Sequence, residues 1–179
     1  MRRRDYWSVI NGEGAVLTVS FEDIEREFGP MVRRIAASHE ADRHLAEELV
    51  QDIWLVLWRA LPAFRGESSL RTFVARVATY RAITHVRRGA RVPRPDEVPE
   101  DLAAYEPGPE EHAIGRDQQS KLLAAVRALP LALRQVALLT LEGLAPQEIA
   151  RVLGITANAV AIRLSRAREM LRNRMGETP

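Results

Sequence analysis

Apolar residues recur every three or four positions along most of the chain, which is the spacing of amphipathic helices. The first half of the chain predicts three such helices. Ser20 is placed to cap the first one, with Asp23 three positions later as its reciprocal partner. The apolar stripe of this helix consists of Phe21, Ile24, Phe28, Val32 and Ile35.

A short polar loop separates the next two predicted helices. The second apolar stripe runs from Leu45 to Leu61 and ends at Pro62, because proline cannot continue a helix. Residues 64–69 read FRGESS, and either serine, Ser68 or Ser69, could cap a third helix that extends to about Arg88.

The second half predicts shorter helices, the first of which begins near Leu122. In this half a proline either interrupts a helix or lies in its first turn. A glycine ends a helix, and a hydroxyl side chain caps the helix that follows. The residues that mark these boundaries are Pro130, Gly143, Pro146, Gly154 and Thr156.

Strand signals are nearly absent apart from a short apolar run at 15–19, so the predicted fold class is all-α. Residues 93–117 hold five of the ten prolines among acidic residues, which is typical of a flexible linker. The sequence therefore predicts two small helical domains, at 21–92 and 118–179, joined by this linker. Residues 1–20 form an N-terminal extension. It could make an extra contact with a regulator through Tyr6 and Trp7, but we expect it to be disordered, as is usual for a terminus.

The stretch between Pro146 and Ser165 has the spacing of a helix-turn-helix. Ala150 is small where two helices must cross closely. Gly154, four residues later, tolerates the positive φ of a tight turn, and Val160 is a branched anchor for the second helix. An ordinary helical hairpin is the alternative interpretation.

The last helix is expected to pack inward through Val160, Leu164, Ala167 and Leu171. Its outer side suits the major groove, where side chains reach base edges and arginines reach phosphates. Ile162, centred on that side, could contact a thymine methyl group or pack on protein. The outward and flanking residues are Asn158, Ala161, Ile162, Arg163, Ser165, Arg166, Arg168, Glu169 and Arg172.

Charge is segregated along the chain although the net charge is only +2. Residues 61–92 carry seven bases and one acid, and residues 121–179 carry nine bases and four acids, whereas acids dominate 21–60 and 93–120. Two basic blocks suggest two places that meet a polyanion. Every base except Lys121 is arginine, which suits forked contacts with phosphate and guanine, although a GC-rich genome gives the same bias.

In the predicted third helix, Arg76, Tyr80, Ile83 and Arg87 share one face. Arginines interleaved with aromatic rings suit single-stranded or opened DNA. Tyr80 is expected to be exposed, whereas Phe64 and Phe73 are better explained as core residues. On the second helix, Glu47, Glu48 and Asp52 form an acidic face that either binds a basic protein surface or is simply solvated.

Several classes of protein are not expected. The chain has no cysteine, so disulfides and thiolate zinc sites are excluded, and no apolar run approaches the roughly 20 residues that span a bilayer. We therefore expect a cytoplasmic protein without membrane insertion. Neither an enzyme nor a cofactor is expected, because phosphate-loop and nucleophile motifs are absent. The histidines lack the spacing of metal ligands; they are His39, His44, His85 and His112.

Two segments together resemble the extracytoplasmic-function (ECF) group of bacterial alternative sigma factors. The run AEELVQDIWLVLWRALPAFRGESSLRTFVARVA is similar to region 2 of that group, and ALPLALRQVALLTLEGLAPQEIARVLGITANAVAIRLSRAREML is similar to region 4. The resemblance covers about residues 21–92 and 118–175. It implies a protein that binds core RNA polymerase, through the clamp helices of the largest subunit and the flap, and directs it to promoter DNA.

The resemblance also assigns residues to each partner. Polymerase docking would use Glu47, Glu48, Leu49, Asp52 and Ile53. The minus-ten element, with one base flipped from the opened strand, would be bound by Phe64, Arg65, Ser68, Ser69, Arg71, Arg76, Tyr80, Arg81, Arg87 and Arg88. The minus-thirty-five element would be read as duplex by Thr156, Asn158, Ala161, Ile162, Arg163, Ser165 and Arg166. An anti-sigma factor is an expected further partner.

The chain departs from the group's common pattern at three places. Tyr80 stands where an asparagine is common near the flipped base, and Ala161 and Ile162 stand where a basic residue and a serine are common. These changes imply an uncommon promoter sequence with more apolar readout at minus thirty-five. Ala145 replaces the usual hydroxyl before Pro146, which would weaken the start of that helix slightly.

Two other functions would use some of the same residues. A one-component regulator in the LuxR style would use only the helix-turn-helix and would need a sensing pocket within 21–92, which the arginine-rich third helix argues against. A helical adaptor that binds only proteins leaves both basic blocks unexplained.

Overall fold

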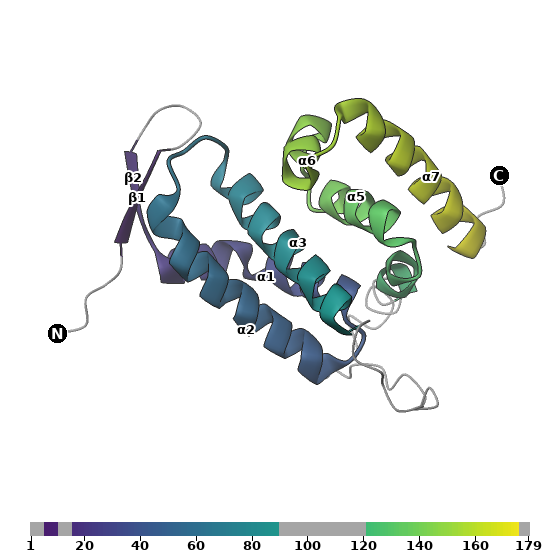
Figure 1. The fold of residues 1–179 in the computed structure, drawn as a ribbon, viewed down its shortest axis with the longest axis horizontal. Coiled ribbons are helices and arrows are strands. Elements are labelled where there is room, and N and C mark those ends of the chain that lie inside the picture. The colour runs from purple at the N-terminus through teal and green to yellow at the C-terminus, as the bar shows by residue number, and fades with distance from the viewer. Residues whose placement is uncertain (1–5, 11–15, 90–120, 176–179) are drawn as a thin grey trace, which may run out of the picture.

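The computed structural model describes residues 6–10, 16–89 and 121–175. The predicted linker at 93–117 lies outside the described residues. Within them, helices dominate, as the apolar spacing predicted, and they are arranged as two packed groups (Figure 1). None of the described helices is long and apolar enough to cross a membrane.

The first group is a bundle of three helices, α1 (Phe21–His39), α2 (Arg43–Ala60) and α3 (Leu70–Gly89), each of which contacts the other two. A short 3₁₀ turn, η1 (Leu61–Ala63), follows α2 where Pro62 stops the α-helix. The bundle encloses an apolar core, which the α2 stripe enters through Leu49, Ile53 and Leu57. Val56, predicted as part of that stripe, is instead exposed at the surface, and Trp54 is buried.

Side-chain caps fix where these helices begin. The amide N–H of Asp23 donates to the Ser20 hydroxyl at 3.1 Å, and the Asp23 carboxylate reaches back to the Ser20 N–H, which confirms the predicted capping box of α1. At α3 the hydroxyl of Ser69 accepts from the N–H of Thr72 at 3.1 Å, so Ser69 rather than Ser68 is the cap.

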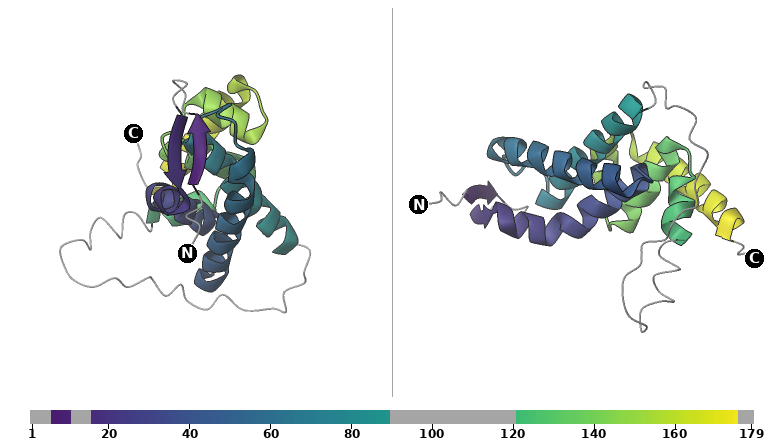
Figure 2. Two further views of the ribbon diagram at one scale, coloured as in Figure 1. Left: turned by 90° about the vertical axis from the view of Figure 1, so that its left-hand side faces the viewer. Right: turned by 90° about the horizontal axis from the view of Figure 1, so that it is seen from below.

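A β-hairpin precedes α1, which corrects the expectation of disorder for residues 6–10 and 16–20. Strands β1 (Tyr6–Ile10) and β2 (Val16–Ser20) pair antiparallel, from Tyr6 opposite Ser20 to Ile10 opposite Val16. Pairing satisfies the backbone groups of each strand that face the other strand, which neither segment could do alone. The hairpin lies at the end of the molecule opposite the C-terminal end of α7 (Figure 2).

The second group contains a helical segment at 121–127 followed by α5 (Leu131–Leu141), α6 (Pro146–Leu153) and α7 (Ala157–Met175). Gly143 and Gly154 end α5 and α6 with φ of 78° and 65°. Only glycine adopts this left-handed conformation without a steric penalty, so both predicted stops have a backbone cause.

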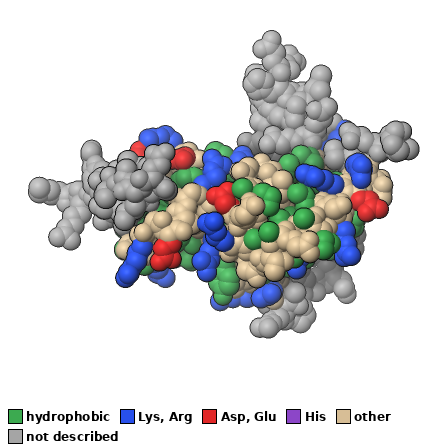
Figure 3. Space-filling model, turned by 90° about the horizontal axis from the view of Figure 1, so that it is seen from above, with side chains coloured by type: hydrophobic (Ala, Val, Ile, Leu, Met, Phe, Trp, Pro, Cys, Tyr) green, Lys and Arg blue, Asp and Glu red, His purple; other side chains and the backbone are tan. Residues whose placement is uncertain are grey.

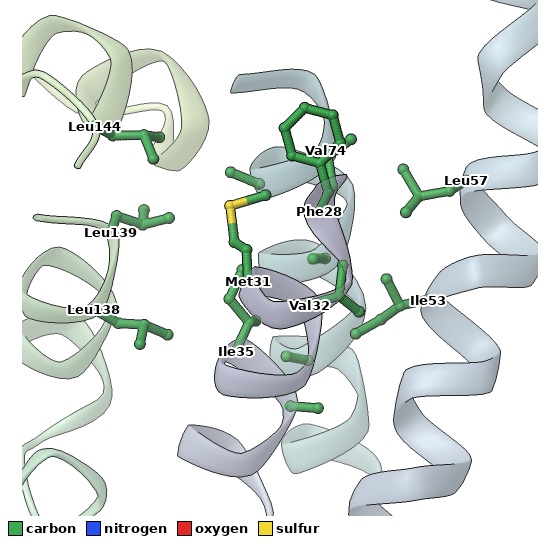
Figure 4. Packing of buried hydrophobic residues seen from close by; sticks show 14 of the residues in the cluster. Phe28, Met31, Val32, Ile35, Ile53, Leu57, Val74, Leu138, Leu139 and Leu144 are labelled. Carbon is green, nitrogen blue, oxygen red and sulfur yellow. The ribbon is translucent and has the colours of Figure 1, made fainter. Parts of the chain in front are cut away.

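The two groups pack directly against each other, which the sequence did not predict. α1 contacts α5, and α3 contacts α6. In Figure 4, the side chains of Leu138 and Leu139 point from α5 toward Met31 and Ile35 of α1. One apolar cluster therefore runs from the three-helix bundle into the second group.

Candidate nucleic-acid and polymerase interfaces

The α6–α7 pair has the geometry of a helix-turn-helix. Gly154 closes α6 in the left-handed conformation, and the next amide, that of Ile155, donates to the carbonyl of Ala150 at 3.1 Å. The Thr156 hydroxyl accepts from the N–H of Ala159 at 3.1 Å and caps α7, as predicted. Ile149 and Val160 are buried across the turn and hold the two helices together.

The start of α6 is secured in a way that the sequence did not suggest. Ala145 has no side-chain oxygen, but the Glu148 carboxylate accepts from the Ala145 N–H at 2.9 Å. Glu148 also accepts from the Thr72 hydroxyl on α3, and this bond, followed by the one from Ala145, holds the pKa of Glu148 below its usual value. Glu148 therefore supplies the reciprocal bond of a capping box, although Ala145 cannot supply the other bond.

The α7 helix turns the predicted side outward. Val160 and Ala167 are buried and Leu164 and Leu171 are half-buried, whereas Ile162 leaves 47% of its surface exposed. Thr156, Asn158, Ala161, Ser165 and Arg166 are exposed as well, and Arg163 is partly exposed. This side of α7 is therefore exposed enough to enter the major groove of DNA.

The residues predicted for the minus-ten element fall into three groups. Arg65, Ser69, Arg71, Arg76, Tyr80, Arg87 and Arg88 are exposed, and Tyr80 leaves 73% of its surface free. Phe64 is half-buried against Phe73, with ring centroids 4.7 Å apart, in agreement with a core role; Ser68 is half-buried too. Arg81 is ion-paired with Asp52 of α2. Basic side chains recur among hydrophobic ones across one broad face of the molecule (Figure 3).

Comparison with known proteins decides the family. Residues 26–92 match the model of sigma-70 region 2, and residues 119–171 match that of sigma-70 region 4. The chain is 31% identical over 140 residues to the RNA polymerase sigma-H factor of Pseudomonas aeruginosa, covering 73% of this chain and 72% of the relative. It is 29% identical over 138 residues to the ECF RNA polymerase sigma-E factor of Haemophilus influenzae, covering 72% of this chain and 73% of that one.

The chain belongs to the ECF group of RNA polymerase sigma factors. Solved structures agree on the fold. The sigma factor RpoE of Bartonella quintana, in complex with the anti-sigma factor NepR, superposes with a TM-score of 0.67 at 20% identity, covering 88% of this chain and 99% of that one. CnrH, in complex with the cytosolic domain of CnrY, gives 0.64 at 21%, covering 89% of each chain.

The structure corrects part of the docking surface predicted for this sigma factor. Leu49 and Ile53 have no exposed surface, because both point into the core between α1, α2 and α3. They cannot touch a partner while the bundle is folded. Glu47 and Glu48 are exposed, and Asp52 is partly exposed beside Arg81.

Sequence reasoning missed the apolar residues that this sigma factor does expose on α2. Leu55 is 49% exposed and Trp58 is 40% exposed, although both belong to an apolar run. Leu55 lies seven residues after Glu48 and three after Asp52, so helical spacing places all three on one side. That spacing was the signal in the sequence from which the exposure of Leu55 could have been predicted.

The histidines of the sigma factor do not assemble a metal site among the described residues. His39 is buried at the end of α1, His85 pairs with Glu40 at 3.0 Å, and His44 is exposed on α2. His112 lies outside the described residues.

A hollow of about 560 Å³ flanks α7 and is lined in part by Leu122, Pro146 and Leu164.

Proposed function

We propose that this alternative sigma factor binds core RNA polymerase in the bacterial cytoplasm, recognises the minus-ten and minus-thirty-five elements of a promoter, and enables promoter opening. In this proposal residues 21–92 bind polymerase and the minus-ten element, residues 118–179 bind the minus-thirty-five element, and residues 93–117 connect them. The observation that carries the proposal is the pairing of region 2 and region 4 in one chain, with an exposed basic face on each.

The minus-thirty-five element is read by the outer side of α7. Asn158, Ala161, Ile162 and Ser165 would reach base edges in the major groove, while Arg163 and Arg166 would bind phosphates. Support comes from the exposure of this side and from the rigid turn at Gly154. An exposed isoleucine in the middle of the reading face favours contact with a thymine methyl group.

The minus-ten element is bound along α3 and the loop that precedes it. Tyr80 offers an exposed aromatic ring on which an unstacked base can lie, and Arg76, Arg87 and Arg88 offer cations for the backbone. Arg65, Ser68, Ser69 and Arg71 extend this surface into the loop. Phe64 supports the loop by packing on Phe73.

Core polymerase docks on the exposed side of α2. The contact surface consists of Glu47, Glu48, Asp52 and Leu55, because only exposed residues can form the contact. Leu49 and Ile53 are buried and lie outside it. Three carboxylates beside an exposed leucine suit a partner with a basic, partly apolar surface, such as the clamp helices. A second contact, between region 4 and the flap, is part of the same proposal.

An anti-sigma factor is the proposed regulatory partner. The sigma factors RpoE and CnrH, which share this fold, were each solved with an anti-sigma factor or the cytosolic domain of CnrY. The proposal assigns the chemistry of RNA synthesis to the polymerase, and this chain supplies only binding and positioning.

Transcription with purified components tests the proposal. Core polymerase and this chain would be incubated with a library of DNA that is randomised across both promoter elements, and initiating templates would be sequenced. We expect transcripts that require the chain and share two conserved elements. Transcription that does not depend on the chain, combined with no capture of core polymerase, would overturn the proposal. Tight duplex binding without polymerase would instead support the one-component regulator.

A further inference from the structure

A hollow of about 390 Å³ lies where the two halves of the molecule meet. One wall is the second half of α3, and the facing wall is formed by the first turns of α5 and the end of α6. Its volume is within the range of sites that hold small organic molecules. The hollow is therefore large enough for a ligand of roughly 10–20 non-hydrogen atoms.

Contacts between the two halves hold the walls of this hollow in place. The Nε and Nη2 atoms of Arg34, on α1, donate to the two carboxylate oxygens of Glu142, next to α5, at 2.6 Å each. Near the start of α3, the Thr72 hydroxyl donates to the Glu148 carboxylate of α6 at 2.6 Å. Charge-assisted bonds of this kind fix orientation as well as distance. The hollow is therefore formed without a ligand, as most small-molecule sites are.

Two polar side chains that line the hollow are buried without a hydrogen-bond partner. Thr79, on α3, is 3% exposed, and its hydroxyl oxygen makes no hydrogen bond to any described residue. Gln135, on α5, is 8% exposed, and its side-chain amide makes none within the described part of the chain. Folded proteins pair the great majority of such groups, because an unpaired one is costly to bury.

The hydroxyl of Thr79 is available because it does not bond back to its own helix. Thr84, one and a half turns later on α3, donates to the carbonyl of Tyr80, four residues before it, at 2.9 Å. Thr140 makes the same kind of bond to Val136 on α5, at 2.8 Å. Thr79 makes no bond of this kind. Its hydroxyl and the amide of Gln135 thus stand ready on facing walls of one hollow.

The rest of the hollow is apolar, with one cation at its rim. Ile83, Leu131 and Val152 line it and are half-buried. Arg87 also lines it, is exposed, and forms no ion pair with a described residue. Along α3, eight residues separate Thr79 from Arg87, which corresponds to a rise of about 12 Å. The hollow therefore has an uncharged polar end, an apolar middle and a cationic end.

We propose that this hollow binds a small amphipathic carboxylate, namely an organic anion with an uncharged hydroxyl or amide group at one end, an apolar ring as its body, and one carboxylate at the other end. The buried end must receive an uncharged group, because a charge buried without an opposite charge is far more costly. Thr79 and Gln135 can each donate and accept, so they match a hydroxyl or an amide. Arg87 would bind the carboxylate at the rim in the forked geometry typical of arginine.

An NMR titration with 4-coumarate, which has a phenol hydroxyl, a flat apolar body and a carboxylate, tests the proposal. Spectra correlating ¹H with ¹⁵N would be recorded on the full labelled chain at pH 7. We expect saturable shifts at the backbone amides around the hollow and at the side-chain NH₂ of Gln135, with a Kd on the order of 0.1 mM. Cinnamate lacks the hydroxyl and 4-coumaramide lacks the charge, so each should bind about tenfold more weakly.

Thr79→Val and Gln135→Leu distinguish a role in binding from a role in packing. Each replaces an unpaired polar group by an apolar group of similar size, so the free chain should be as stable as the parent or more stable. Each should weaken binding of 4-coumarate about tenfold, and the double variant should no longer distinguish 4-coumarate from cinnamate. Thr84→Val is the matched control, because the Thr84 hydroxyl is already bonded and does not line the hollow.

Arg87→Gln tests the cationic end. This variant should lose the roughly tenfold preference for 4-coumarate over 4-coumaramide, because the carboxylate no longer meets a charge. Arg88→Gln is the control, because Arg88 is the next residue, is exposed, and lies outside the lining of the hollow. Both variants lose one positive charge, so a difference between them cannot come from net charge.

Three results would overturn the proposal. The first is no saturable binding of 4-coumarate, 4-hydroxybenzoate or 4-hydroxyphenylacetate up to about 10 mM, which would leave the hollow to water. The second is a set of shifts that lies away from α3, α5 and α6. The third is a double variant Thr79→Val, Gln135→Leu that still prefers 4-coumarate to cinnamate as the parent does. None of these readouts involves transcription, so the sigma-factor function is tested separately.

Discussion

Arg81 of α3 is ion-paired with Asp52 of α2, so two residues that the family resemblance assigns to different partners neutralise each other. The side chain of Arg81 is only 22% exposed, and its Nε atom is buried without a hydrogen-bond partner among the described residues. The pair joins the two helices that carry the proposed polymerase and minus-ten surfaces. Arg81 therefore has a structural role even before any DNA is bound.

This pairing predicts different behaviour for two arginines on α3. Arg76→Ala should weaken minus-ten binding and reduce its salt dependence by about one released counterion, because Arg76 is exposed. Arg81→Ala should instead lower the unfolding free energy and leave the salt dependence nearly unchanged. Anisotropy titrations from low to high salt, with urea unfolding, would separate the two. Equal salt slopes for both variants would contradict the assignment.

Leu49→Ala and Leu55→Ala test the corrected docking surface. Leu49 is fully buried, so its truncation should lower the unfolding free energy by about 2–5 kcal/mol. Leu55 is 49% exposed, so its truncation should cost less than about 0.5 kcal/mol and should reduce capture of core polymerase. Urea unfolding and a polymerase pull-down measure both effects. Normal capture by Leu55→Ala would remove this residue from the docking surface.

Ile162→Ser should change which minus-thirty-five sequences are selected. Loss of an apolar contact removes the preference for a thymine methyl group, while stability changes little because the side chain is exposed. Leu141→Ser, at an exposed leucine of α5, serves as the control. Sequencing of templates selected with reconstituted polymerase provides the measurement. An unchanged preference in Ile162→Ser would refute the base-reading role.

Gly154→Ala isolates the cost of the turn. A Cβ atom at this position would meet nothing within 4 Å, so the penalty of about 1–2 kcal/mol comes from the positive φ alone. Gly29→Ala is the comparison, because Gly29 lies inside α1, where alanine is favoured by up to about 1 kcal/mol. Its added Cβ would meet only the guanidinium of Arg33, at 3.4 Å or more, which can move away. The midpoint temperature of thermal unfolding should fall for Gly154→Ala and rise for Gly29→Ala.

His39 gives the stability a pH dependence. Burial lowers the pKa of His39, and the nearby charges of Arg134 and His85 lower it further, although a hydrogen bond with the Ile35 carbonyl acts in the opposite direction. The unfolded chain therefore binds a proton at a higher pH than the folded chain does. The unfolding free energy should fall as the pH drops through about 6.5, the usual pKa of histidine.

Urea unfolding between about pH 5.5 and 7.5 would measure this slope. His39→Gln should flatten it, whereas His44→Gln, at an exposed position of α2, should leave it as in the parent chain. A slope that His39→Gln does not change would show that other groups cause the pH dependence.

Local features of the fold could be predicted from the sequence because they depend on residues close together in the chain. The Ser20–Asp23 capping box, the Thr156 cap and the turn at Gly154 each involve positions within a few residues. Helical spacing also predicted the buried and exposed sides of α7. These elements follow from hydrogen bonding and φ preferences that do not need the rest of the protein.

Features that depend on distant parts of the chain were missed. Arg34 and Glu142 are 108 residues apart, and no pattern in the sequence pairs them. Leu49 and Ile53 are a different case, because helical spacing placed both on the apolar stripe of α2, and only the family resemblance assigned them to the docking surface. The hairpin is also a different case, because Asn11-Gly12 between two apolar runs is a local hairpin signal in the sequence.

Ser20 ends β2 and also caps α1, so no spacer residue separates the hairpin from the bundle. A change in the backbone angles of Ser20 that reoriented the hairpin would strain the cap bonds to Asp23. A partner that pulled on the hairpin would therefore act first on the N-terminal turn of α1, because Ser20 belongs to both elements.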